Sequence, residues 1–277
     1  MGLRINTNVA SLSAQRSLGM NKLNTDNNLR KLSSGERITR AADDAAGLAI
    51  SEKLKSHIRG MRQARRNADD GISLIQTAEG GLAEVSNLIV RLRELAVQAA
   101  SDTVGDTERG FSDIEFQQLK EEINRISKGL EFNGRKLLDG TGGIVDVQVG
   151  IFNDPGLDRI SYDATTTDAT IASLGIIGET IGSKEGAQLT LDKLDSALQR
   201  VNGVRANLGA LQNRLQSAVN NLAVTDENLS AANSRIRDVD VAAETADMAK
   251  NNILNQASVA VLAQANNAPQ FALKLIS

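Results

Sequence analysis

The chain contains no cysteine, no tryptophan and only two prolines among its 277 residues. The lack of cysteine excludes disulfides and thiolate metal sites. Aromatic residues make up only 2% of the sequence, fewer than a compact core of this length normally uses. Alanine, leucine, valine and isoleucine must therefore do the packing, which suits thin seams between helices. The scarcity of proline permits those helices to be long.

An excess of positive charge and long apolar runs are also missing. The net charge of −3 leaves no electrostatic footprint for nucleic acid, so we expect no nucleic-acid partner. A run of about 18 apolar residues would be needed to span a membrane, and the sequence has none. The first residues, Met1 to Asn8, show neither the apolar core nor the cleavage site of a secretory signal peptide. If the protein is exported, we expect a route that does not use a cleaved leader.

The strongest pattern present begins at a plausible N-cap pair, Asp43-Asp44, and ends near Ala100. Its stripe residues recur at alternating steps of three and four: Ile50, Leu54, His57, Met61, Ala64, Ala68, Gly71, Ile75, Ala78, Leu82, Val85, Ile89, Leu92, Ala96 and Ala99. Only His57 and Gly71 interrupt the apolar character. A repeat sustained this far predicts a coiled-coil-like helix on the order of 85 Å long.

Two further helices are predicted to run antiparallel to this one. After a turn over residues 101–106, one helix has an apolar face made of Phe116, Leu119, Ile123, Ile126 and Leu130. The other has a regular stripe made of Leu194, Ala197, Val201, Val204, Leu208, Leu211, Leu215, Ala218, Leu222, Thr225, Leu229, Ala232 and Ile236. Together the three rods predict one elongated antiparallel bundle.

Between the second and third rods the period changes from helical to two. Val145, Val147 and Val149 alternate with polar residues, and Asp154-Pro155-Gly156 is a turn signal. Alternation resumes at Ile160 and Tyr162. We therefore predict a small β-hairpin in this part of the chain.

Both chain ends are amphipathic helical segments without a globular partner in the sequence. The residues predicted to form their apolar stripes and to mediate self-assembly are Ile5, Val9 and Leu12 at the first end, and Leu254, Ala257, Val261, Ala265, Ala268 and Leu275 at the second. Helices this weakly striped are marginal in isolation. We expect them to be disordered in the free monomer and to become helical by docking against other copies of the chain.

Residues that could support chemistry have simpler structural interpretations. His57 is the only histidine and lies within a helix stripe, where a packing role is expected. The pairs Asp43-Asp44 and Asp69-Asp70 are adjacent in sequence, which favours capping or solvation over acid–base catalysis. The loop 140–143 lacks the Gly-Lys-Ser/Thr of a phosphate loop. The cluster of Arg62, Arg65 and Arg66 suggests a solvated or intersubunit face. We predict no catalytic, cofactor or metal residues, and no enzyme.

Many short motifs in this order resemble those of bacterial flagellin over nearly the whole chain. They are residues 5–8 (INTN), 32–35 (LSSG), 37–38 (RI), 41–50 (AADDAAGLAI), 67–73 (NADDGIS), 76–80 (QTAEG), 93–98 (RELAVQ), 131–134 (EFNG), 234–236 (SRI), Asp238 with Asp240, and 261–266 (VLAQAN). Only about forty residues separate Gly134 from the third rod, so the chain resembles a short flagellin without the outer variable domains.

The resemblance implies a mainly α fold: antiparallel coiled-coil-like rods, a small β-hairpin and paired N- and C-terminal helices. Residues 1–40 and 237–277 would form the two halves of an inner-tube domain. Residues 41–135 and 183–236 would form the rod domain, with the hairpin and its connection at 136–182. The implied function is a structural subunit that polymerises with itself into the flagellar filament for swimming motility.

The resemblance also implies partners. These are the flagellar type III export apparatus, a flagellin chaperone, the filament cap and hook-associated proteins, with the assembled protein extracellular in the filament. An animal Toll-like receptor is a further possible partner, through a surface that would include Arg91, Leu95 and Glu115.

The sequence leaves three further functions open. A flagellin-like protein joining hook and filament would share the fold. A chemoreceptor-type signalling hairpin would share the alanine-rich heptads, and a soluble enzyme would need a polar pocket.

Overall fold

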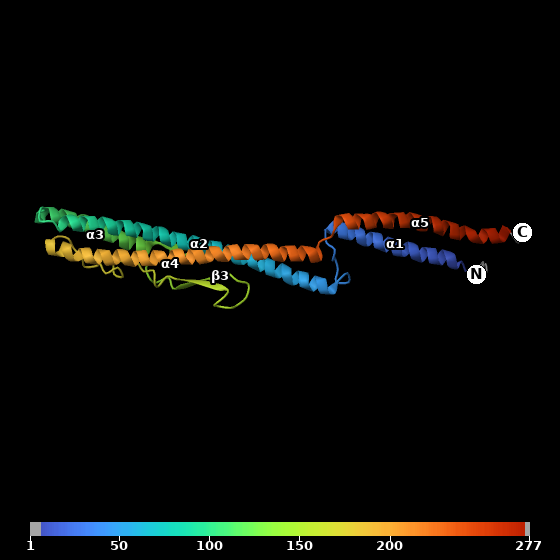
Figure 1. The fold of residues 1–277 in the computed structure, drawn as a ribbon, viewed down its shortest axis with the longest axis horizontal. Helices are drawn as coiled ribbons and strands as arrows, with labels where there is room; N and C mark the ends of the chain where they lie inside the picture. The colour runs from blue at the N-terminus through green and yellow to red at the C-terminus, as the bar shows by residue number, and fades with distance from the viewer. Residues whose placement is uncertain (1–6, 275–277) are drawn as a thin grey trace. The chain divides into compact units, whose positions relative to one another are not determined.

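The computed structural model describes residues 7–274, with side chains described as far as residue 267. Its helices are α1 (Val9–Ser34), α2 (Ala45–Ala99), α3 (Asp106–Gly129), α4 (Lys184–Arg237) and α5 (Val241–Lys274). Its strands are β1 (Glu131–Phe132), β2 (Arg135–Lys136), β3 (Ile144–Gln148) and β4 (Arg159–Asp163) (Figure 1). The predicted fold of antiparallel rods, a small hairpin and paired terminal helices is confirmed.

The chain forms two compact units, residues 57–227 and residues 1–56 with 228–277. The domain bounds expected near residues 40 and 237 stay a prediction, and the divisions between these units lie inside α2 and α4. The reason is local: the ends of the two long helices bond to each other through polar groups. Ser51 Oγ donates to Asn233 Oδ1 at 2.8 Å, and Arg237 forms an ion pair with Glu52.

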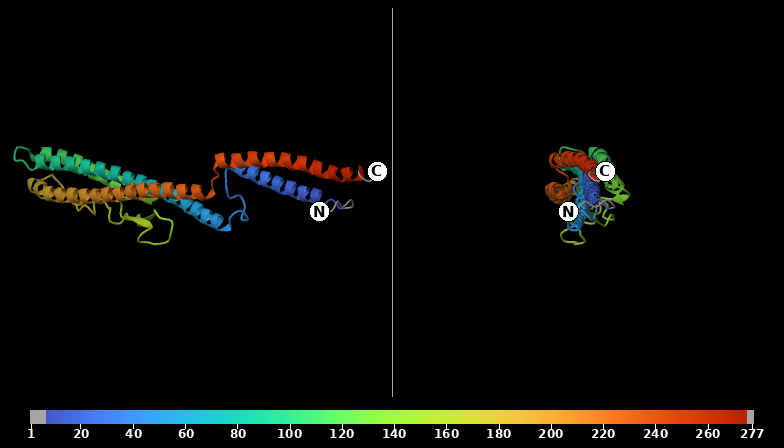
Figure 2. Two further views of the ribbon diagram at one scale, coloured as in Figure 1. Left: turned by 45° about the vertical axis from the view of Figure 1, so that its right-hand side comes forward. Right: turned by 90° about the vertical axis from the view of Figure 1, so that its right-hand side faces the viewer.

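In the unit of residues 57–227, α2, α3 and α4 lie side by side (Figures 1 and 2). Ion pairs Arg62–Asp226 (3.0 Å) and Arg93–Asp195 (2.7 Å) join α2 to α4 in opposite chain order, so these helices are antiparallel. The predicted α2 stripe is buried from Met61 to Ala99. The stripe prediction is wrong for Ile50, because that side chain is 52% exposed.

The stripe of α4 is buried most deeply over its first half. Leu194, Ala197, Val201, Leu208 and Leu215 are all buried against the common core. Beyond Leu215 the predicted stripe positions are only half-buried. The hydrophobic core is therefore concentrated where α3 and the hairpin segment add a further layer to α2 and α4.

The predicted hairpin is confirmed as the antiparallel pair β3–β4, with Val145 opposite Tyr162 and Val147 opposite Ile160. Gly71, which interrupts the α2 stripe, makes room for it: a Cβ at Gly71 would lie 3.0 Å from Val147 Cγ2. A second hairpin, β1–β2, was not predicted. Its two-residue turn is Asn133-Gly134, with φ of 50° and 77°, the sequence signal typical of such turns.

Lys120 on α3 is buried, with only 4% of its surface exposed. Its Nζ donates to Gln117 Oε1 at 3.0 Å, to the Ile177 carbonyl at 3.2 Å and to the Glu179 carbonyl at 2.8 Å. It therefore ties α3 to the segment that precedes α4. Burial lowers the pKa of Lys120, because desolvation disfavours the charged ammonium; the charges of Asp113 and Glu179 oppose this effect.

We expect Lys120→Met to remove a pH-dependent part of the stability. The pKa of Lys120 is lower in the folded chain than its ordinary value of 10.5, so the unfolded chain binds more protons between the two values. In that window the free energy of unfolding of the wild type should rise with pH relative to that of Lys120→Met. Urea unfolding followed by circular dichroism at several pH values measures this, and a constant difference between the two proteins would contradict it.

Candidate assembly interface

The described residues of the two chain ends pair with each other as α1 and α5 (Figures 1 and 2). Asn8 caps α1 by accepting from the Ser11 N–H at 3.0 Å, and its Nδ2 donates to the Ala265 carbonyl at 2.7 Å. Further along, Asn21 Nδ2 donates to Ser258 Oγ at 2.9 Å. The partners on α5 have lower residue numbers as the residue numbers on α1 rise, so the two helices are antiparallel.

The face on which α1 and α5 meet has coiled-coil spacing but is largely polar. We call it the polar seam: its positions are Ser11, Ala14, Leu18, Asn21, Thr25, Asn28 and Leu32 on α1, and Glu244, Met248, Asn251, Asn255, Ser258, Leu262 and Ala265 on α5. All of these are buried or half-buried, at alternating steps of three and four. On α1 the buried residues are Ser11, Ala14 and Asn28, so no large apolar side chain of α1 is fully buried in the seam.

Large apolar side chains of both helices point away from the polar seam. On α1 the exposed ones are Val9, Leu12, Met20, Leu23 and Leu29; on α5 they are Val241, Ile253, Leu254, Val259 and Val261. Val9 and Val261 are each 57% exposed. The pair thus has polar groups at many seam positions and several large apolar side chains on its outer surface, unlike an ordinary two-helix coiled coil. We call these outward-facing residues the apolar faces.

The structure places the residues predicted to mediate self-assembly in three groups. The exposed group is Val9, Leu12, Leu254 and Val261, which belong to the apolar faces, together with the smaller Ala257. Ala265 is half-buried in the polar seam, where its carbonyl accepts from Asn8. Ile5 and Leu275 lie outside the described residues, and so does the side chain of Ala268.

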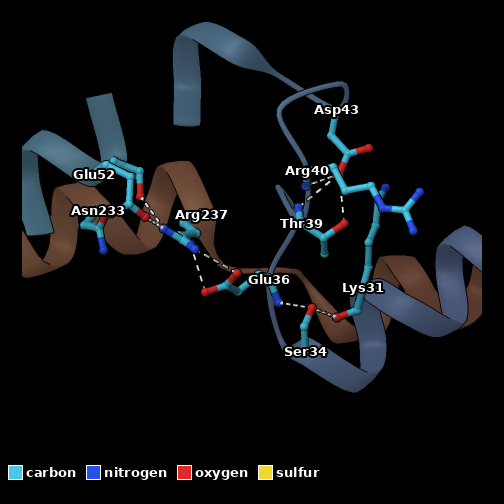
Figure 3. A network of polar contacts seen from close by, with 10 residues as sticks. Lys31, Ser34, Glu36, Thr39, Arg40, Asp43, Glu52, Asn233 and Arg237 are labelled. Atoms are coloured by element: carbon cyan, nitrogen blue, oxygen red, sulfur yellow. Dashed lines mark hydrogen bonds and ion pairs between the residues drawn. The ribbon is translucent and has the colours of Figure 1, made fainter. Parts of the chain in front are cut away.

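A network centred on Arg237 joins the segment after α1 to the end of α4 (Figure 3). The guanidinium contacts Glu36 through Nε to Oε1 at 2.8 Å and through Nη2 to Oε2 at 3.1 Å, and it also forms an ion pair with Glu52. Beside it, the Arg37 N–H donates to the Arg237 carbonyl at 2.6 Å, and the Val239 N–H donates to the Gly35 carbonyl at 3.0 Å. Sequence reasoning missed this network, because its members are far apart in the chain.

The Arg237 side chain is 15% exposed, and its hydrogen bonds shift its ionisation. The bonds to Glu52 and to Glu36 raise the pKa of the guanidinium above its usual value, so it stays cationic. Gly35 ends α1 with a φ of 71°, a left-handed conformation that suits glycine, and its N–H donates to the Lys31 carbonyl at 2.9 Å. The network and this cap together set where the chain leaves α1.

Of the pair Asp43-Asp44, Asp44 caps α2 and Asp43 bonds the segment that precedes it. Asp43 Oδ2 accepts from the Thr39 hydroxyl at 2.9 Å and from the Arg40 N–H at 3.0 Å (Figure 3). These bonds, with that of Thr39 the strongest, lower the pKa of Asp43. Asp44 Oδ1 accepts from the Gly47 N–H at 2.9 Å in the first turn of α2.

The surface predicted for receptor binding is placed on α2 and α3. Arg91 Nη2 lies 2.9 Å from Glu115 Oε1 and its Nη1 lies 2.9 Å from Glu94 Oε2, with all three side chains exposed. Leu95 does not share that exposure: it is 3% exposed and packs in the core of the three rods. The expectation that Leu95 belongs to the open surface is therefore corrected, because α2 turns this residue toward its neighbouring helices.

The other polar candidates have ordinary contacts. His57 is half-buried and meets Phe152 edge to face, with ring centroids 5.8 Å apart. Arg62 pairs with Asp226, and Arg66 donates to Gln63. Within the described residues, no group of three or more histidine, cysteine or acidic side chains is arranged to hold a metal ion. None of the helices in the described part of the chain combines the length and the apolar character needed to cross a membrane.

Comparison with known proteins agrees with this architecture. The bacterial flagellin N-terminal helical region matches residues 5–142, and the bacterial flagellin C-terminal helical region matches residues 191–276. The flagellin of Halalkalibacterium halodurans is 48% identical over 272 residues, which cover 98% of this chain and 99% of that protein. The chain belongs to the bacterial flagellin family.

This flagellin is of the short form, and other relatives agree in length. The flagellar filament 30.7 kDa core protein of Treponema maltophilum is 42% identical, with 99% of each chain covered. The crystal structure of Bacillus cereus flagellin is 33% identical, covers 61% of this chain and 94% of that one, and superposes with a TM-score of 0.51. The flagellin described here is thus a structural subunit of the flagellar filament. Family membership favours this role over that of a hook–filament junction protein, a signalling hairpin or a soluble enzyme.

Proposed function

We propose that the α1–α5 pair forms the inner tube of the filament by packing its apolar faces against those of other copies. The observation that supports this is the distribution of side chains on the pair, with hydrogen bonds inside and Val9, Leu12 and Val261 outside. Exposed large apolar side chains on the outer surfaces of both helices mark an interaction surface. Self-assembly is a property of the family, and these faces are the surface that it requires.

The energies agree with assembly-dependent ordering of the ends. Fully burying one Val or Leu side chain stabilises by about 1.5–3 kcal/mol. Ordering each residue of the chain costs about 1–2 kcal/mol of backbone entropy, and a hydrogen bond returns only about 0.5–1.5 kcal/mol net. The polar seam by itself therefore does not offset the cost of ordering both helices. Burial of the apolar faces against neighbouring copies supplies the rest.

The remaining parts of the chain receive roles from the same proposal. Residues 41–135 and 183–236 form the rod shell around the tube, and residues 136–182 form a hairpin that covers part of the rods. The role is mechanical and non-catalytic. The protein is exported without cleavage through the flagellar type III apparatus, with a chaperone that covers the apolar faces first. It then meets hook-associated proteins and the filament cap outside the cell.

Receptor binding by the exposed face of the rods is part of the proposal as well. Arg91, Glu94 and Glu115 form a charged cluster on α2 and α3 that a Toll-like receptor would contact. Leu95 would support this face from below by packing, because it is buried.

Thiol labelling of assembled and free protein tests the inner-tube proposal. The chain has no cysteine, so Val9→Cys and Val261→Cys each create one reporter on an apolar face. We expect their maleimide labelling to slow by about tenfold or more on polymerisation, because a thiol reacts only when it is accessible.

A control reporter is Leu157→Cys in the loop between β3 and β4, where the native side chain is 81% exposed. Its labelling should change much less. Equal labelling of Val9→Cys in filaments and in monomers would reject the proposed location of the apolar faces.

A further inference from the structure

Asn28 lies in the polar seam, near the C-terminal end of α1, and is 7% exposed. In the amide orientation that matches donors with acceptors, its nitrogen lies 3.3 Å from Glu244 Oε1 and its oxygen 3.2 Å from Asn251 Nδ2. Both partners belong to α5. Nearby, Asn255 Nδ2 donates to Thr25 Oγ1 at 2.9 Å, and Lys31 Nζ lies 3.7 Å from Glu244 Oε2. Every one of these polar groups on α1 thus has a partner on α5.

Apolar contacts alone do not specify a partner. Inside a filament many copies of α1 and α5 lie close together, and any apolar face can pack on any other. A buried amide is different, because without a hydrogen-bond partner it costs about 1–3 kcal/mol. A polar residue in a coiled-coil seam therefore selects partner and register while lowering stability. Charge adds to the selection, since Lys31 in the last turn of α1 lies 3.7 Å from Glu244 in the first turn of α5.

We propose that the polar seam directs α1 onto α5 of the same chain and away from the helices of other copies. Asn21, Asn28 and Asn255 act as positioning residues in filament assembly, and they do so at a cost in stability. The apolar faces then remain available for intersubunit packing. This inference rests on the proposed function, because it assigns intrachain contacts to the polar seam and interchain contacts to the apolar faces.

Disulfide trapping in the full-length chain tests the assignment. The reporter is the pair Ser11→Cys and Asn266→Cys, whose native side chains meet at 2.7 Å between Oγ and Oδ1. The chain has no other cysteine. Filaments of the reporter chain are oxidised, and non-reducing electrophoresis then separates intrachain from interchain disulfides. The seam variant combines Asn21→Leu, Asn28→Leu and Asn255→Leu, and the control is Asn27→Leu, an exposed neighbour on the same helix.

In the native seam we expect mostly intrachain disulfide. In the seam variant we expect the ratio of intrachain to interchain product to fall by about tenfold, the effect of losing one ordinary specificity interaction. The melting temperature of the assembled filaments should rise at the same time. The control Asn27→Leu should leave the ratio unchanged, and Asn28→Leu alone should give a smaller fall.

A purely structural role for these hydrogen bonds predicts the opposite for stability, because removing them would lower the melting temperature. An unchanged disulfide ratio in the seam variant, or a lower melting temperature, overturns the inference. Failure of the proposed function is seen separately, as continued labelling of Val9→Cys in filaments. The disulfide ratio and the labelling are separate readouts on filaments, and each can fail while the other succeeds.

Discussion

Replacing Leu12 and Val261 together by glutamine should abolish seeded polymerisation while the rods of residues 57–227 stay folded. These side chains are 54% and 57% exposed in the chain, so the substitutions remove little from the fold of one subunit. In a filament each loses the burial of the roughly half of its surface that is exposed in the free chain, about 0.8–1.6 kcal/mol per side chain. A total loss of about 1.6–3.2 kcal/mol raises the critical concentration by roughly tenfold to two-hundredfold.

The measurement is sedimentation of polymer after addition of filament seeds, with electron microscopy of the pellet. Circular dichroism of the soluble variant should still show the helical rods. The matched control is Leu157→Gln, which removes an even more exposed leucine from the hairpin loop. Normal filaments from the Leu12→Gln, Val261→Gln variant would show that the apolar faces are not the main assembly surface.

The second large effect is expected for Arg237→Met. The Nη2 of the arginine donates to Glu36, Nε lies 2.8 Å from the same carboxylate, and Nη1 pairs with Glu52 (Figure 3). The Arg237 side chain is 15% exposed. Hydrogen bonds to charged groups contribute about 1.5–3 kcal/mol each when partly shielded from water. Their removal should loosen the segment of residues 35–44 and the end of α4, and thereby weaken polymerisation.

Amide exchange of the Arg37 and Val239 N–H groups reports this loosening directly, since both donate to carbonyls within the network. Exchange at both should accelerate by about tenfold or more for a local loss above about 1.4 kcal/mol. Arg237→Lys should recover only part of the protection, because an ammonium has one nitrogen and cannot bond Glu36 and Glu52 through separate nitrogens as the guanidinium does. Arg235→Met, a change at an exposed arginine two residues away, should leave exchange as in the wild type. Wild-type exchange in Arg237→Met would argue that the backbone bonds alone hold the segment.

The buried face of α2 was predicted in large part from the periodicity of its apolar residues. The stripe from Met61 to Ala99 could be predicted because each of its members repeats at helical coiled-coil spacing, and a buried face leaves that record in the sequence. The same pattern did not show that Leu95 is buried as well. That residue lies beside the stripe, and it is covered because α2 has two helical neighbours rather than one.

The network centred on Arg237 could not be predicted from sequence periodicity. Arg237 and Glu36 are some two hundred residues apart in the chain, and neither stands in a repeating pattern. A contact of this kind is decided by how the chain folds back on itself, so a single sequence does not reveal it. The turn of β1–β2 is different, because its Asn133-Gly134 pair is a local signal that the sequence does carry.

The sequence by itself determined the helices, the hairpin, the antiparallel order of the rods and, through its motifs, the resemblance to flagellin. It also marked Val9, Leu12, Leu254 and Val261 as apolar stripe residues of the ends. Only the tertiary structure decided that these residues face outward while asparagine, serine and threonine face inward. The physical reason is that an apolar stripe records burial in the final assembly, whether its cover comes from the same chain or from another copy.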